Sequence, residues 1–234
     1  MPNSTVDSRT EAVSIPLAIV TGGMLVAALY LIFIWAPMER SMGMVQRIFY
    51  FHVPSALTAF VAFFIGGYAS IQYLIKRESR YDDLSVACNE AGLVFAIVNL
   101  VTGSLWAKPV WGVSWAWDAR LTTMLLLALI YAGYLILRQS ITDPSQRAVS
   151  CAVVSIFGIV DIPIVYMANR WWRTQHPQPV MFDSEGSLDT DMRIVLYFSF
   201  AAMCVLLWVM VRTRKRLERM RHEVEGLRRE VHAL

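Results

Sequence analysis

Two histidines and a tryptophan-rich stretch are the residues of this chain whose types and spacing could do chemistry. His52 lies in QRIFYFHVPSA and His176 in RWWRTQHPQPV, and between them runs WGVSWAWDARLT, residues 111–122. Two neutral imidazoles on opposite sides of a planar iron macrocycle make a bis-histidine haem site. Stacked or edge-on indoles form a rigid apolar surface that suits such a macrocycle. The pattern therefore favours haem binding.

The tryptophan stretch has an apolar part and a polar part. Trp111 and Trp115 are four residues apart and would share one face of a helix, whereas Trp117 would point elsewhere. Asp118 precedes the run LTTMLLLALIYAGYLIL and is expected to cap the start of a helix. Arg120 could reach lipid headgroups or pair with a carboxylate of a bound ligand. The candidate site comprises His52 and His176 as metal ligands, with Trp111, Trp115, Trp117, Asp118 and Arg120 around the ligand.

The composition is that of a membrane protein. Of the 234 residues 56% are hydrophobic and 17% are charged, whereas a soluble domain has about a quarter charged residues. Helices of about 20 apolar residues cross a bilayer, and these runs are too long for barrel strands. We predict an all-α polytopic fold with six spans at about 14–36, 53–75, 84–106, 121–138, 148–168 and 191–211. The first run lacks a cleavage-site pattern and is expected to remain as a helix.

Basic residues indicate the orientation of the six spans. Fourteen lie in or directly beside the two terminal segments and the loops 76–83 and 139–147, and seven lie in or directly beside the other loops. The positive-inside bias therefore predicts that both termini are cytoplasmic. The loops 37–52, 107–120 and 169–190 would face the periplasm of a bacterial inner membrane. Seven of the eight tryptophans fall on that side, whereas an ordinary aromatic belt occupies both.

The chain divides into a transmembrane domain, 1–211, and a basic helical tail, 212–234. Apolar residues of the tail are spaced three and four apart, as in a heptad seam: Leu217, Met220, Val224, Leu227, Val231 and Leu234. One interpretation is a solvated helix that continues the sixth span and contacts anionic lipid; the other is a docking helix for a cytoplasmic partner. His222 and His232 lie in this tail and are expected to be solvated.

Several other chemistries have little support in the sequence. Cys88, Cys151 and Cys204 lie in apolar runs and form no CxxC pair, which argues against thiol redox chemistry and covalent haem attachment. No phosphate-binding loop or dinucleotide fingerprint occurs, and no nucleic-acid partner is expected. A zinc site would need three or four ligands. The carboxylates that leave this metal alternative open are Glu39, Asp118, Asp183, Glu185 and Asp189.

Three motifs, VTGSLWAKPVWGVSWAWDARLT, RIFYFHVPSA and RWWRTQH, together with six spans and this length, resemble the CcmC family of cytochrome c maturation. WGVSWAWDARLT looks like the family's WWD motif. The resemblance implies that haem b, iron protoporphyrin IX, binds on the outer face between axial ligands His52 and His176. It also implies transfer to the haem chaperone CcmE, with CcmD, CcmA and CcmB as partners. The chain has no hydrolase or redox motif. Whether it has a lyase-like role in attaching haem to CcmE stays open.

Two positions depart from the family pattern, and two other functions stay open. Ala107 stands where glycine is expected before a Lys-Pro pair, and Asp161 stands in an apolar run where an amide is usual. A permease that moves haem or another substrate through its own bundle would use polar residues inside spans, such as Glu90, Asn99 and Asp161 beside Pro163. A scaffold subunit with an ordinary tryptophan belt is the second alternative.

Overall fold

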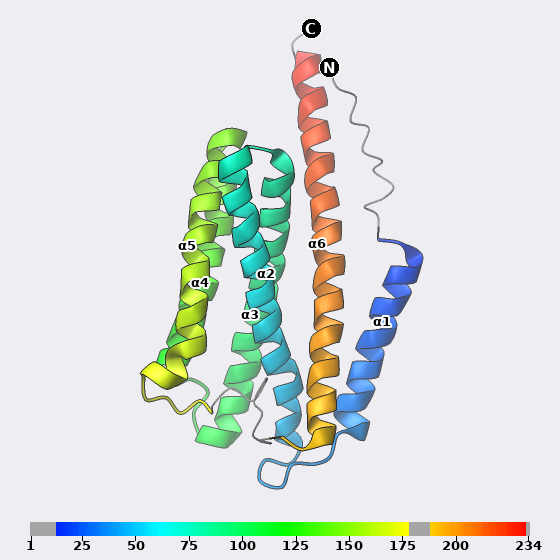
Figure 1. The fold of residues 1–234 in the computed structure, drawn as a ribbon, viewed down its shortest axis with the longest axis vertical. Helices are drawn as coiled ribbons and strands as arrows, with labels where there is room; N and C mark the ends of the chain where they lie inside the picture. Colours follow the sequence, from blue (N-terminus) through cyan, green and yellow to red (C-terminus); the bar gives the residue numbers. More distant parts are fainter. Residues whose placement is uncertain (1–12, 178–187, 233–234) are drawn as a thin grey trace.

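Six long helices make up the part of the chain that this computed structural model describes, residues 13–177 and 188–232 (Figure 1). They are α1 Ile15–Tyr30, α2 Phe49–Lys76, α3 Ser79–Trp111, α4 Ala119–Ser140, α5 Pro144–Trp171 and α6 Thr190–His232. A π-helical turn, Leu31–Trp35, continues α1, and a 3-10 helix, Met44–Ile48, leads into α2. The described residues contain no strand, and all six helices are long and apolar enough to cross a bilayer. The predicted all-α, six-span fold is confirmed.

Helices α2 to α6 are longer than the apolar runs that predicted them, whereas α1, even with its π-helical turn, lies within its predicted run. α2 begins at Phe49 rather than at residue 53, and α3 ends at Trp111 rather than at 106. Hydropathy marks the part of a helix that crosses the hydrocarbon, whereas backbone hydrogen bonding continues into the polar interface. His52 therefore lies in the first turn of α2 rather than before it.

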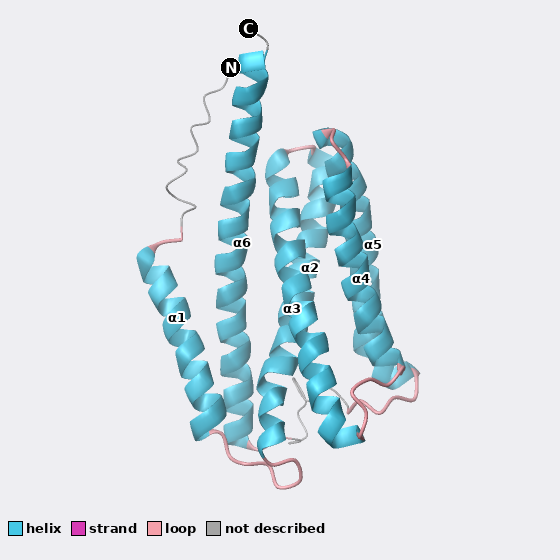
Figure 2. Ribbon diagram, turned by 180° about the vertical axis from the view of Figure 1, so that it is seen from behind, coloured by secondary structure: helices cyan, strands magenta, loops and turns pink. Residues whose placement is uncertain are grey.

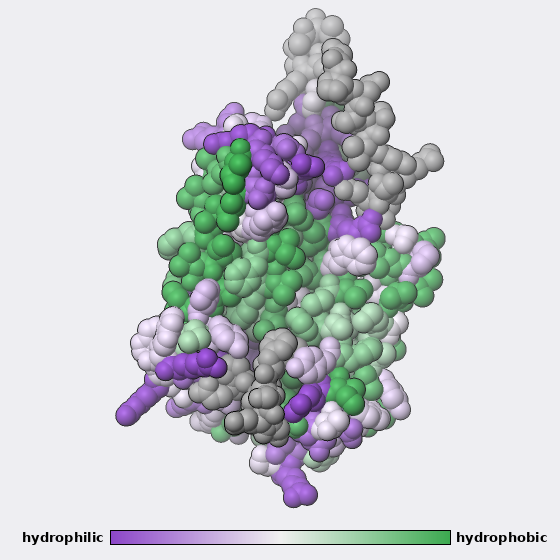
Figure 3. Space-filling view, in the orientation of Figure 1, coloured by the Kyte–Doolittle hydropathy of each residue, from purple (hydrophilic) through white to green (hydrophobic). Residues whose placement is uncertain are grey.

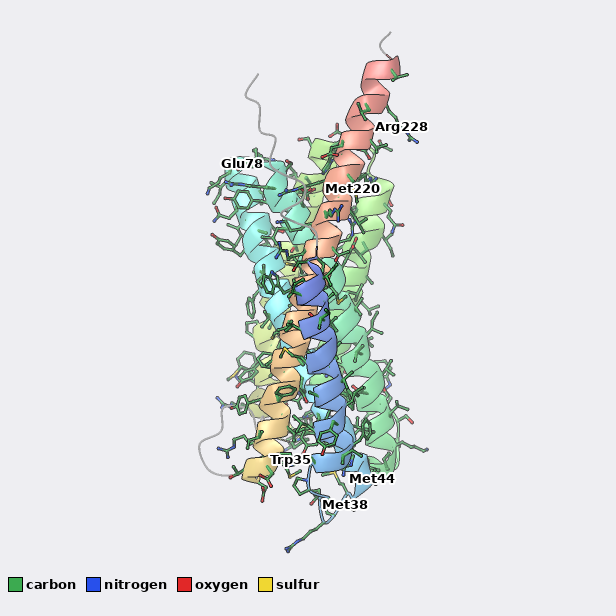
Figure 4. All side chains as sticks on the ribbon, turned by 90° about the vertical axis from the view of Figure 1, so that its right-hand side faces the viewer. Trp35, Met38, Met44, Glu78, Met220 and Arg228 are labelled. Atoms are coloured by element: carbon green, nitrogen blue, oxygen red, sulfur yellow. The ribbon has the colours of Figure 1, made fainter. Side chains whose placement is uncertain are left out.

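The helices run alternately up and down, so successive loops lie at opposite ends of the bundle. Figures 1 and 2 show α2 and α3 in the middle, α4 and α5 on one side, and α6 with α1 on the other. Residues 36–43, 112–118 and 172–177 lie at one end, which we call the pocket end. Figure 4 places Trp35, Met38 and Met44 at that end and Glu78, Met220 and Arg228 at the opposite end, the tail end.

A broad hydrophobic band crosses the middle of the face shown in Figure 3, with hydrophilic surface toward both ends. Large apolar side chains in it point outward, among them Ile34, Ile136 and Val160. Such a band is unfavourable in water and suits a bilayer, in which lipid tails solvate it. The chain is a multi-pass membrane protein; which end faces the cytoplasm stays a prediction.

An aromatic core joins the central helices. The rings of Phe63 on α2 and Tyr131 on α4 stack with centroids 3.7 Å apart and planes 6° apart. The Tyr131 hydroxyl donates to the carbonyl oxygen of Ser155 on α5 at 3.2 Å. Of the three cysteines, all of them free thiols, Cys88 and Cys151 are buried, in accord with the packing role expected of them. These contacts pack the middle parts of α2, α4 and α5 against one another.

α6 runs through residues 211 and 212 without a break, so the expected helical tail is a continuation of the sixth span. The heptad side chains of the tail that the structure describes are exposed: Leu217, Met220, Val224, Leu227 and Val231. Leu234 and the His232 side chain lie outside the described residues. His222 differs from the expectation of a solvated histidine, because its Nε2 lies 3.1 Å from Oδ1 of Asp83 on α3.

Candidate functional site

A pocket of about 470 Å³ opens at the pocket end of the bundle. α2, α3 and α4 and the loop after α5 form its walls, and most of its lining is apolar. Polar side chains that line it include His52, Asn99, Arg120, Gln175 and His176. An apolar concavity with a few convergent polar groups is the usual form of a small-molecule site.

The imidazole of His52 is oriented by α3. Its Nδ1 lies 3.1 Å from the carbonyl oxygen of Asn99 and 3.3 Å from Oγ1 of Thr102. The Asn99 side-chain amide donates to the carbonyl oxygen of His52 at 2.9 Å. The Asn99 amide nitrogen also lies 3.2 Å from Nδ1, but it already donates to the His52 carbonyl oxygen; because the Asn99 carbonyl oxygen can only accept, we assign the ring proton to Nδ1. Nε2 then keeps its lone pair, the form in which imidazole binds a metal.

Gly103 makes room for the His52 ring. A Cβ at position 103 would lie 2.8 Å from Cε1 of His52 and 3.3 Å from Nδ1. Atoms in packed protein do not approach this closely without a shift of one of them. The absence of a side chain at Gly103 is therefore a condition for the observed position of the ring.

His176 lies in the loop after α5, which hydrogen bonds tie down. Thr174 Oγ1 accepts from the backbone N–H of His176 at 3.0 Å. The Asn169 amide donates to the carbonyl oxygens of Pro177 at 2.6 Å and His176 at 3.3 Å. Nδ1 of His176 lies 3.0 Å from the Pro177 carbonyl oxygen, so by the same reasoning Nε2 keeps its lone pair.

The polar part of the tryptophan stretch holds this histidine loop to α4. Asp118 Oδ1 accepts from the backbone N–H of Leu121 at 2.9 Å, which confirms the predicted helix cap. Its other oxygen, Oδ2, accepts from the Thr174 hydroxyl at 2.7 Å. Arg120 Nη1 donates to Oδ1 of Asn169 at 2.9 Å. Asp118 and Arg120 thus position His176 through intermediate side chains.

The two imidazole rings lie close together across the pocket. Their centroids are 6.1 Å apart, and their planes are tilted by 31°. A metal–imidazole bond is about 2 Å long, and adding roughly 1 Å from nitrogen to ring centre gives about 6 Å between two rings that share one metal from opposite sides. The separation and the free Nε2 atoms fit a shared iron.

Three tryptophans line the pocket around these rings. Trp106 packs edge-on to His52 at 5.8 Å, and Trp111 packs edge-on to His176 at 6.4 Å. Trp115 also contributes to the lining. Indoles at the edges of both imidazoles restrict ring rotation and keep the walls apolar.

Trp117 lies outside the pocket lining. It is 77% exposed and packs edge-on against Trp115, with centroids 5.6 Å apart. Gly112, with φ of +79°, ends α3 and turns the chain, so residues after Trp111 leave the helix. The structure brings the two histidines, Trp111, Trp115 and Arg120 together and sets Trp117 behind Trp115.

Burial and, secondarily, the positive charge of Arg120 lower the pKa of His176 to about 4. The imidazole is therefore neutral at pH 7 and available to a metal. Arg120 also lines the pocket, so it could pair with a carboxylate of a bound ligand. The pocket therefore offers a neutral imidazole and a cation in an apolar setting.

Sequence reasoning missed the side chains that position the histidines. Thr102, Gly103 and Thr174 lie inside the quoted motifs but were given no role, Asn169 directly precedes RWWRTQH, and Asn99 was assigned only to a hypothetical transport path. Asn99 and Asn169 are buried amides in otherwise apolar helices. Buried amides almost always have partners, so this signal could have found two of the five.

The metal alternative gains no support from the described residues, in which no group of three or more His, Cys, Asp or Glu side chains converges. Glu39 accepts hydrogen bonds from Ser41 and Met42 of its own loop. Asp183 and Glu185 lie outside the described residues. A zinc site of three or four protein ligands therefore has no location in the part of the chain that is described.

Two of the three intramembrane polar residues cited for a permease have structural partners. Glu90 forms an ion pair with Arg214, and Asn99 is bonded to His52. Asp161 is buried, and its Oδ2 has no partner among the described residues. Glu90 and Asn99 are therefore engaged in contacts within the protein.

Fold and site define a multi-pass, all-α membrane protein with an apolar, two-histidine pocket at one end of the bundle. The model of the family "CcmC: Heme exporter protein C" matches residues 2–230. Heme exporter protein C of Bradyrhizobium diazoefficiens is 35% identical over 193 residues, which cover 82% of this chain and 73% of the relative. The Escherichia coli K12 protein of that name is 33% identical over 177 residues, covering 74% and 69%.

The chain therefore belongs to the heme exporter protein C family. Membership assigns it a role in haem handling for cytochrome c maturation, within the Ccm haem-export system of a membrane.

Proposed function

We propose that this chain binds haem b in the pocket at the pocket end, with His52 and His176 as axial ligands. The observation that carries the proposal is the pair of imidazoles 6.1 Å apart, each with Nδ1 against a backbone carbonyl oxygen. Bound iron protoporphyrin supplies the metal for both Nε2 atoms. A hydrogen bond at Nδ1 sets the tautomer and ring orientation and increases the basicity of the ligand nitrogen.

The other pocket residues have separate roles in this proposal. Trp111 and Trp115 provide apolar walls for the macrocycle, and Trp117 supports Trp115 from outside. Arg120 pairs with a propionate of haem, while its contact to Asn169 keeps the second histidine in place. Asp118 starts α4 and anchors the histidine loop.

We further propose that the pocket end faces the periplasm of a bacterial inner membrane and that haem passes from there to CcmE. CcmD, CcmA and CcmB are the proposed partners within the Ccm system. The distribution of basic residues supports this orientation, because the terminal segments and tail-end loops carry fourteen of the twenty-one. The pocket's location at a bundle end, beside loops rather than in mid-membrane, suits transfer to a tethered chaperone.

The axial assignment is tested with His52→Ala and His176→Ala, purified after expression with a haem supply. Each variant should lose most of its haem and show an altered Soret band. His222→Ala, which removes a histidine at the tail end, is the matched control and should keep the native occupancy and spectrum. Full occupancy with an unchanged spectrum in both pocket variants would overturn the assignment.

Delivery and transport are distinguished by two readouts. In cells that express the pocket variants, haem covalently bound to CcmE should fall together with haem occupancy of this chain. Vesicles that contain this chain alone and enclose haem should show no haem transfer across the membrane. Transport by the isolated chain would instead favour the permease.

A further inference from the structure

A second cavity, of about 540 Å³, lies at the tail end between the α4–α5 turn and α6. Five arginines and two glutamates are among its lining side chains, which gives a formal charge of +5 − 2 = +3. This cavity is remote from the histidine pocket, and the proposed haem binding does not involve it. Whether the carboxylates neutralise these arginines decides what the cavity can bind.

Arg138 of α4 is paired through both terminal nitrogens of its guanidinium, although its Nε has no partner among the described residues. Its Nη1 and Nη2 donate to the two oxygens of Asp82 on α3 at 2.9 and 2.8 Å. Nη2 also donates to Glu218 on α6 at 3.1 Å. All three residues are buried, so this cluster ties α6 to α3 and α4.

The two glutamates that line the cavity also form ion pairs with arginines of the chain. Glu90 pairs with Arg214, which donates in addition to Glu218 at 2.7 Å. Glu225 accepts from Arg221 at 3.0 Å, one turn earlier on α6. Each carboxylate of the lining therefore already has its own cation.

Arg147 and Arg228 have no carboxylate partner among the described residues, and of the two only Arg147 is buried. It lies in the first turn of α5, lines the cavity and is only 4% exposed. Among the described residues its guanidinium forms no ion pair and no side-chain hydrogen bond, and its Nε is buried without a partner. A buried charge without a counter-ion is strongly unfavourable, so a group of opposite charge from outside the chain is expected there.

We propose that this cavity binds the phosphate of an acidic phospholipid headgroup, with Arg147 as its principal ligand. The planar guanidinium fork matches two phosphate oxygens, and basic pockets between membrane helices are suited to such headgroups. Leu135 and Ile141 line the same cavity and offer apolar surface for the start of an acyl chain. The tail end also borders the hydrophobic band in Figure 3, where headgroups lie. Free phosphate would offer the same oxygens without an apolar part.

The test uses the full chain in nanodiscs of phosphatidylcholine, with and without phosphatidylglycerol. Phosphatidylglycerol should raise the melting temperature of the native chain, and this increment should vanish in Arg147→Gln. In native mass spectrometry the variant should retain about five-fold less phosphatidylglycerol than the native chain. Arg216→Gln changes an exposed arginine of α6 that does not line the cavity and is the matched control, which should retain the native increment.

Two outcomes would overturn the proposal. If Arg147→Gln lowers the melting temperature equally in both lipid mixtures, Arg147 has a structural role only, since removal of an unpaired buried charge should not destabilise the lipid-free site. If inorganic phosphate in phosphatidylcholine nanodiscs stabilises the native chain as much as phosphatidylglycerol does, the ligand is a free anion rather than a lipid.

Discussion

Arg120 donates to Oδ1 of Asn169 at 2.9 Å, and the amide nitrogen of the same Asn169 donates to the carbonyl oxygens of His176 and Pro177. Helix α4 is therefore linked to the His176 backbone through the Asn169 side chain of α5. This relation separates ligation from positioning, because a residue that touches no ligand controls where a ligand atom lies.

Replacement of Asn169 should therefore weaken haem binding without loss of the bundle. In Asn169→Ala, the loop that carries His176 loses its two carbonyl contacts, and we expect haem affinity to fall about 10–100-fold, as for other changes that disturb a metal ligand's support. Haem titration by Soret absorbance measures the affinity, and circular dichroism checks helix content. Arg170→Gln, at the exposed next residue, is the control and should bind as the native chain does. Equal affinity of both variants would show that the amide is not needed.

Gly103→Ala should displace the His52 ring. A Cβ there would lie 2.8 Å from Cε1, so the ring must move away from its hydrogen bond to the Asn99 carbonyl oxygen. We expect lower haem occupancy and a shifted Soret band. Gly133→Ala provides the matched control, because a Cβ at position 133 meets no atom within 4 Å. That substitution should leave binding unchanged and stabilise α4 by up to about 1 kcal/mol.

The low pKa of His176 predicts an unusual pH dependence. Its value of about 4 lies below the ordinary 6.5, so the unfolded chain takes up a proton between these values that the folded chain does not. In haem-free protein this histidine therefore reduces folding stability as pH falls from about 6.5 to about 4, and above 6.5 it has no effect. Under the proposed ligation, a proton competes with iron at this nitrogen only near pH 4 and below.

Nuclear magnetic resonance of histidine-labelled, haem-free protein measures this value directly. The Cε1 signal of His176, assigned by its loss in His176→Gln, should titrate with a midpoint near 4. A midpoint near 6.5 would mean that the ring is solvated and that the loop does not occupy the position described.

Asp118 and Asp143 allow the cap and the loop anchor to be measured separately. Both carboxylates cap a helix, Asp118 through Leu121 at 2.9 Å and Asp143 through Gln146 at 2.7 Å. Replacement of either by alanine should lower the free energy of unfolding by about 1 kcal/mol. Only Asp118→Ala should also weaken haem binding, because only Asp118 holds Thr174. A haem defect of the same size in Asp143→Ala would attribute the effect to general instability.

The tryptophans should differ in importance. Trp115 lines the pocket, whereas Trp117 is 77% exposed and packs against Trp115 from outside. We expect Trp115→Ala to reduce haem affinity by about tenfold or more, in line with a loss of roughly 1.5–3 kcal/mol of apolar burial. Trp117→Ala should have a much smaller effect. The Soret titration used for Asn169 measures both, and a larger loss in Trp117→Ala would contradict the described loop.

Local sequence carried enough information for the helices and one cap. Bilayer-length apolar runs predict helices because every backbone polar group must find its partner within the segment when lipid surrounds it. Asp118 before an apolar run predicts a cap because the bond spans only three residues. The observed helix ends differ from the predicted ones by several residues, because along the chain the hydropathy falls before the backbone hydrogen bonding of the helix ends.

The sequence by itself determined the six-helix class, the placement of both histidines in segments that the alternation of spans puts at one end, and the resemblance to a haem-handling family. Only the tertiary structure decided that the rings lie 6.1 Å apart, that Gly103 accommodates one of them and that Asn169 and Thr174 hold the other. It also decided that Trp115 faces the pocket while Trp117 does not. The physical reason is that these contacts join residues far apart in the chain, or depend on where the chain turns after Gly112, and such contacts leave no local periodic pattern.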